Sequence, residues 1–163
     1  MRVIGIDPGT AITGWGVVEY DGNEVKSVAY GAITTPAHTP LPERLQTIYQ
    51  ELTALVTHWQ PETAAMEEIF FSKNAKTALV VGHGRGVAML ALVNAGLSIA
   101  EYKPLEVKQA ITGHGSADKQ QMQQMVRLLL ALDDIPRPDD AADALAVAIC
   151  HVHSARLRLL EAK

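Results

Sequence analysis

Three strand-like segments joined by very short links occupy the first third of the chain and limit how it can begin to fold. The segments are rich in β-branched and aromatic residues and cover residues 2–7, 12–20 and 25–34. A Pro-Gly pair follows the first segment, and an Asp-Gly pair typical of a hairpin turn separates the second from the third. Links this short predict an antiparallel meander.

The hydrophobic period changes after residue 34 from that of a strand to that of a helix. Apolar residues from 45 to 59 recur at i, i+3, i+4 and i+7, which predicts a helix over residues 41–59. Strands are then expected at 63–71 and 98–102, and helices at 75–95, 105–111, 119–132 and 139–160. The 163 residues fit a single α/β domain, 1–163, with a mixed five-stranded sheet flanked by helices.

The composition favours a cytoplasmic protein without a membrane span. Cys150 is the only cysteine, so no internal disulfide can form, which fits a reducing compartment. No basic-then-apolar leader precedes Arg2. The longest apolar runs are read as too short, or too interrupted by charge, to cross a bilayer.

The charges are unevenly distributed along the chain. The net charge is −4, which by itself argues against a nucleic-acid partner. Residues 73–127, however, hold seven basic and three acidic residues, a surplus of +4, whereas the remainder holds seven basic and fifteen acidic residues, or −8. This basic segment is either a phosphate-facing surface or a set of solvated helix faces, and charge alone leaves both open.

Asp7 ends the first apolar strand, immediately before Pro8 and Gly9. A lone carboxylate at the lip of a sheet interior is costly to desolvate, so a basic group or a bound cation must lie near it. Two more acids, Glu67 and Glu68, interrupt the apolar strand "AAMEEIFF". Side chains alternate along a strand, so one acid points to each face. In a central strand beside the first, one of them would meet Asp7; in an edge strand it would lie in water.

A second pair of acids lies in "PDDAADALAVAI". Asp140 and Asp143 are three residues apart on one helix face, roughly 5–6 Å between Cβ atoms. The flanking alanines allow that helix to approach a sheet closely. Carboxylates gathered in this way need a counter-charge, and hard oxygen ligands suit Mg²⁺ or Mn²⁺ better than Zn²⁺. A pair of such ions can drive phosphodiester hydrolysis.

The segments "GIDPGTAITGWGVV", "AAMEEIFFSKNAKTAL", "GRGVAML", "EYKPLEVKQAITGHGSADKQQMQQMV" and "PDDAADALAVAICH" together resemble the RuvC family of Holliday junction resolvases. The resemblance covers about residues 1–155. It implies an RNase H-like fold and a homodimer that cuts four-way DNA junctions during recombination and repair. It also implies a site that binds two Mg²⁺ ions, with Mn²⁺ as a substitute, and RuvAB as a branch-migration partner. The implied metal ligands are Asp7, Glu67 rather than Glu68, Asp140 and Asp143.

The same resemblance implies further residues for DNA. Phe70 would stack on bases near the junction centre, and Lys108 and Lys119 would lie near the scissile phosphate, where Lys119 stabilises the transition state. Basic residues of the 73–127 segment would hold the DNA backbone. The full set expected to contact DNA is Phe70, Lys73, Lys76, Arg85, Lys108 and Lys119.

Two other functions fit parts of the sequence. "GIDPGT" followed by a hairpin also resembles the phosphate-binding opening of sugar kinases and actin-like ATPases, but those proteins need two such domains, for which 163 residues leave little room. A junction-binding protein with a decayed site is disfavoured because all four acids are present. The apolar 75–95 helix is either a subunit interface or buried within its own subunit.

Overall fold

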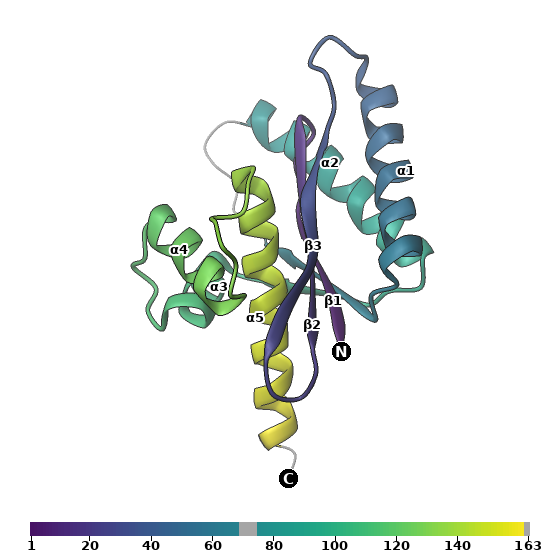
Figure 1. Ribbon diagram of the computed structural model, residues 1–163. Helices are drawn as coiled ribbons and strands as arrows, with labels where there is room; N and C mark the ends of the chain where they lie inside the picture. Colours follow the sequence, from purple (N-terminus) through teal and green to yellow (C-terminus); the bar gives the residue numbers. More distant parts are fainter. Residues whose placement is uncertain (69–74, 162–163) are drawn as a thin grey trace.

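The computed structural model describes residues 1–68 and 75–161, and its centre is a five-stranded sheet in the order β3-β2-β1-β4-β5. Figure 1 shows this sheet nearly edge-on, with helices on both sides. The strands are β1 (Arg2–Asp7), β2 (Ile12–Tyr20), β3 (Val25–Thr34), β4 (Thr63–Glu67) and β5 (Ile99–Tyr102). The helices are α1 (Leu41–Trp59), α2 (Ala75–Asn94), α3 (Pro104–Thr112), α4 (Lys119–Leu129) and α5 (Asp139–Glu161).

The sheet is mixed, as the sequence predicts. β1, β2 and β3 form an antiparallel meander, while β4 pairs parallel with both β1 and β5. The turn between β2 and β3 includes Gly22 at φ +107°, and the Asp21 carboxylate accepts hydrogen bonds from the two backbone N–H groups of Asn23 and Glu24. β4 is therefore a central strand beside β1, which removes the edge-strand alternative for its acids.

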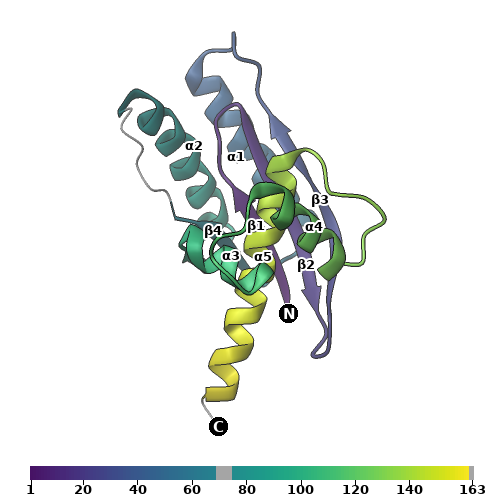
Figure 2. The same cartoon turned by 90° about the vertical axis from the view of Figure 1, so that its left-hand side faces the viewer.

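Each face of the sheet has its own hydrophobic core. α5 crosses one face, with α3 and α4 packed beside it, and α1 and α2 cover the other face (Figures 1 and 2). Alternation along β1 follows this division: Val3 packs toward α5, whereas Ile4 and Ile6 pack toward α1 and α2. Gly5 and Asp7 consequently belong to the α5 face.

Two element boundaries differ from the expectation by more than one residue. The strand predicted to reach residue 71 ends at Glu67, and residues 69–74 lie outside the described part of the chain. The helix predicted to reach residue 132 ends at Leu129, because Ala131 turns into the left-handed region at φ +50°. The N–H of Leu132 then donates to the carbonyl of Arg127, which closes the helix end.

The expectation that every apolar run is too short for a membrane span is wrong for α2. Lys76–Asn94 is, within the described residues, the one helix long and apolar enough to cross a bilayer by length and composition. Only 22% of that window is buried inside the protein. Length and composition are weak evidence for a span, since a helix that packs against another protein surface has the same pattern.

Candidate active site

Glycines in β1 and β2 let α5 lie unusually close to the sheet. A Cβ built on Gly5 would lie 2.0 Å from the carbonyl oxygen of Ala144, and one on Gly16 would lie 2.7 Å from the Leu145 side chain. Gly5 and Gly16 are cross-strand partners on the α5 face. Small residues are thus needed on the sheet as well as on the helix, where Ala144 and Ala148 are fully buried.

The same close approach brings the start of α5 to Asp7. Gly14 is the cross-strand partner of Asp7, and a Cβ on Gly14 would lie 2.0 Å from the carbonyl oxygen of Asp140. The backbone of Asp140 therefore rests on the residue beside Asp7. Asp143 follows one turn later, and its pKa responds to Asp140 as well as to Lys119.

The register of β4 brings Glu67 to the same place. Gly5 pairs with Ala65 and Ile6 with Met66, and β4 continues to Glu67 as β1 continues to Asp7. Ala65 packs in the core beneath α5, so alternation puts Glu67 on that face too. This register distinguishes Glu67 from Glu68 by geometry.

The four acids influence one another electrostatically. The pKa of Asp7 rises from 3.8 to about 7, chiefly because burial disfavours its charge and then because Asp143, Asp140 and Glu67 repel it. Burial likewise raises the pKa of Glu67, with Asp143 adding to the effect. Burial is also the main reason why the pKa of Asp143 is raised. Such a group of acids stays ionised only near positive charge.

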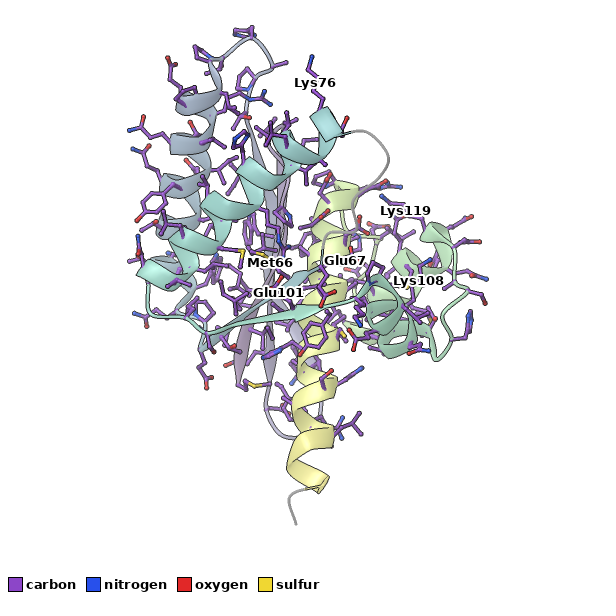
Figure 3. All side chains as sticks on the ribbon, turned by 180° about the vertical axis from the view of Figure 1, so that it is seen from behind. Met66, Glu67, Lys76, Glu101, Lys108 and Lys119 are labelled. Atoms are coloured by element: carbon purple, nitrogen blue, oxygen red, sulfur yellow. The ribbon has the colours of Figure 1, made fainter. Side chains whose placement is uncertain are left out.

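Two lysines supply part of that charge. The Lys119 Nζ lies 3.4 Å from Asp143 Oδ2 and 3.5 Å from Asp139 Oδ2. Although partial burial acts against its charge, Asp143 and Asp139 raise the pKa of Lys119. Lys108 acts on Glu67 and opposes the rise of its pKa. Figure 3 shows Lys108 and Lys119 near Glu67, and all three, with Asp143, line a pocket of about 230 Å³.

Local capping fixes where Lys119 stands. The Asp118 carboxylate accepts a hydrogen bond from the Gln121 N–H at 2.9 Å, and the Gln121 side chain accepts one from the Asp118 N–H at 3.0 Å. This reciprocal cap begins α4 at Lys119. A lysine at a helix start opposes the helix dipole, so its ion pairs with α5 offset an unfavourable position.

The donor set suits a hard divalent cation. Within residues 1–68 and 75–161, no three histidine, cysteine, aspartate or glutamate side chains are close enough to ligate one ion as they stand. Asp7 is electrostatically coupled to the other three carboxylates, and Asp143 is paired with Lys119. The oxygen-only chemistry of Asp7, Glu67, Asp140 and Asp143, and the raised pKa of Asp7, fit Mg²⁺ or Mn²⁺.

The remaining residues expected to contact DNA are dispersed. Phe70 and Lys73 lie outside the described residues. Lys76 is exposed at the start of α2, away from Glu67, Lys108 and Lys119 (Figure 3). Arg85 points inward instead: its side chain is 12% exposed and binds the carbonyl of Glu67 and the carboxylate of Glu101.

Sequence reasoning missed three contributors to this site. Gly14 sets the approach of Asp140, and a glycine inside a strand was the available signal. Asp139 forms an ion pair with Lys119, as Asp143 does. The sequence offered no reason to include it, because an acid in the first turn of a helix is already explained by the helix dipole. The contacts of Arg85 with Glu67 and Glu101 could not be predicted from the sequence, because they join residues from three separate elements.

Comparison with known proteins places this architecture in one family. The family model for "Crossover junction endodeoxyribonuclease RuvC" matches residues 3–151. A crossover junction endodeoxyribonuclease RuvC from Chloroflexus aggregans is 61% identical over 155 residues, covering 95% of this chain and 94% of that protein. Two Thermus thermophilus RuvC structures, one alone and one in complex with Holliday junction substrate, are 37% identical and cover 96% of each chain, with TM-scores of 0.89 and 0.92.

Proposed function

This chain belongs to the RuvC family of crossover junction endodeoxyribonucleases, and from that premise we propose how its own residues carry out the reaction. The chain is a structure-specific endodeoxyribonuclease that resolves Holliday junctions in recombination and repair, on the RNase H-like fold of the family. It is a nuclease that depends on a divalent metal. The observation that carries the residue proposal is the close approach of α5 to the sheet, which places Asp140 against Gly14, the cross-strand partner of Asp7.

Asp7, Glu67, Asp140 and Asp143 would hold two Mg²⁺ ions, or Mn²⁺ in their place. When bound, such ions lower the pKa of an attacking water and take up charge on the departing 3′ oxygen. Asp7 ends β1, between β2 and β4, and it is coupled to Asp140 and Asp143 at the start of α5, so it lies centrally among the acids that would hold the metal. Asp7 and Glu67 are half-buried, and partial burial strengthens electrostatic interactions relative to those in open water.

The lysines would act on the phosphate. Lys119 is held by two carboxylates at 3.4 and 3.5 Å, beyond short hydrogen-bond length, so its ammonium group can turn to a phosphate oxygen without a large loss. Lys108 lines the same pocket from α3. Two positive groups beside the carboxylates would stabilise the charge that develops in the transition state.

DNA binding by Phe70, Lys73 and Lys76 stays a prediction, and so do RuvAB as a partner and a cytoplasmic location. We also propose that the chain acts as a homodimer. A four-way junction is nearly two-fold symmetric, and a two-fold dimer presents two sites for its two cuts. Four large apolar residues on α2 are exposed and support an interface there: Leu79 (63%), Val80 (39%), Leu90 (53%) and Val93 (57%).

The test of the site compares wild type with Asp7→Asn on a synthetic four-way junction, with and without Mg²⁺. We expect the variant to bind the junction but to cut it at least about 10³-fold more slowly, because a neutral amide holds a divalent cation much less well than a carboxylate does. Binding is followed by gel shift without metal, and cleavage by product formation after metal is added.

Two outcomes would contradict the proposal. Nicking by Asp7→Asn at the wild-type rate would place the chemistry elsewhere. Equal inactivity of wild type and variant under all metal conditions would favour a junction-binding protein that does not cut.

A further inference from the structure

Arg85 of α2 forms a bridge to the end of the strand that carries Glu67. Its Nη1 donates a hydrogen bond to the Glu67 backbone carbonyl at 2.6 Å, and its Nη2 pairs with the Glu101 carboxylate on β5. The side chain is only 12% exposed. One guanidinium thus ties together α2, β4 and β5.

The contact falls where the β-ladder of β4 ends. Glu67 pairs with Tyr102, the last residue of β5, and the next N–H, that of Glu68, donates to the Tyr102 carbonyl. The Glu67 carbonyl therefore lies at the end of the β4–β5 hydrogen-bond ladder. The hydrogen-bond donor to this carbonyl comes from Arg85 of α2. An arginine fork is suited to this task because it presents several donors in a fixed plane.

Arg85 acts through the backbone of Glu67, since the positive side chain that acts on the Glu67 carboxylate is Lys108. We propose that Arg85 is a positioning residue: it fixes the end of β4 so that the Glu67 carboxylate faces Asp7 and Asp143. This inference rests on the proposed role of Glu67 as a metal ligand. It differs from the expectation that Arg85 binds DNA, because Nη1 and Nη2 each already contact an acceptor within the protein.

The experiment measures cleavage of a four-way junction as a function of Mg²⁺ concentration for wild type, Arg85→Gln and Arg85→Lys. A loosened Glu67 should raise the Mg²⁺ concentration for half-maximal rate about tenfold and lower kcat about 10–100-fold. Junction affinity without metal, and its dependence on salt, should stay at wild-type values. Lysine should restore little, because one ammonium group cannot span both acceptors.

Arg2 offers a matched control. Its guanidinium donates to the Trp59 backbone carbonyl at 2.8 Å and pairs with Glu19 at 3.2 Å, the same pair of contacts at the opposite end of β1 from Asp7. Arg2→Gln should lower thermal stability much as Arg85→Gln does, without changing the Mg²⁺ requirement. If Arg85→Gln does not fold, Arg85→Lys carries the comparison alone.

The outcomes separate this inference from the proposed function. Loss of cleavage in Glu67→Gln together with a normal Mg²⁺ requirement in both Arg85 variants would overturn the positioning role only. Weaker junction binding with a shallower salt dependence, restored by Arg85→Lys, would instead make Arg85 a phosphate contact and overturn it as well. Full cleavage by Glu67→Gln would refute the role of Glu67 as a metal ligand, on which both the proposed function of the site and the positioning role of Arg85 depend.

Discussion

At the scale of the residue, Asp7 is an acid held where its charge is unfavourable. Its pKa in the folded protein is about 7, against 3.8 for an ordinary aspartate. Between these values the folded state retains a proton that the unfolded chain has lost, so the free energy of unfolding falls as pH rises. The contribution of Asp7 to the free energy of unfolding is fully present below about pH 4 and is lost as pH rises through 7.

Asp7→Asn should therefore stabilise the metal-free protein at high pH. At pH 8 we expect the variant to exceed wild type in free energy of unfolding by roughly 2–4 kcal/mol, with the difference shrinking toward zero near pH 4. Urea unfolding in EDTA across this range measures it. Adding Mg²⁺ at pH 8 should raise the Tm of wild type more than that of Asp7→Asn. A variant less stable than wild type at pH 8 would contradict the burial argument.

The sequence drew attention to Asp7, to the Glu67-Glu68 pair and to Asp143 because each interrupts an apolar strand or an alanine-rich helix. Only the resemblance to the RuvC family selected Glu67 over Glu68 and added Asp140, whose place in a first helical turn has a structural explanation of its own. The sequence could not predict the contacts of Arg85, because nothing in the spacing of α2 distinguishes an arginine that faces solvent from one that faces β4. A residue that does not fit the pattern of its own helix or strand can be recognised from the sequence. The residue it contacts in another helix or strand can be identified only once the fold is known.

At the scale of the element, the close contact of α5 with β1 and β2 determines the site. The strands, their order in the chain and the mixed sheet were predictable from period and turn residues. The depth at which α5 lies was not, because it depends on Gly5, Gly14 and Gly16 facing one helix, and that requires the register. The end of α4 was likewise set by one left-handed residue, Ala131.

Gly14→Ala should harm catalysis more than it harms folding. The new Cβ would lie 2.0 Å from the Asp140 carbonyl oxygen and 2.3 Å from the Asp140 carbonyl carbon, so the start of α5 must shift away from Asp7. We expect a stability loss of about 1–3 kcal/mol and a drop in kcat of about 10²-fold in the folded protein. Gly16→Ala, which meets the Leu145 side chain at 2.7 Å, should lose stability with a smaller fall in kcat. Equal losses of kcat would contradict this reading.

At the scale of the whole molecule, α2 connects a candidate subunit interface to the site. One side of it exposes Leu90 and Val93, while another holds Arg85 against β4. It also meets the turn after Asp7, where the Thr10 hydroxyl donates to the Val80 carbonyl at 2.7 Å. A partner packed on α2 would thus steady both strand ends that carry acids, which relates the dimer to the catalytic geometry.

Leu90→Glu with Val93→Glu should convert a dimer into a monomer. Each exposed apolar side chain buried in an interface contributes about 1.5–3 kcal/mol, so the pair should weaken association by at least about 10²-fold. Analytical sedimentation at micromolar concentration measures this association. The control is Leu128→Glu, which changes a leucine on α4 that is 58% exposed. On a plasmid bearing a cruciform, the monomer should leave single nicks where the dimer makes paired cuts. A wild-type monomer at these concentrations would contradict the proposed interface, and so would dissociation caused by Leu128→Glu alone.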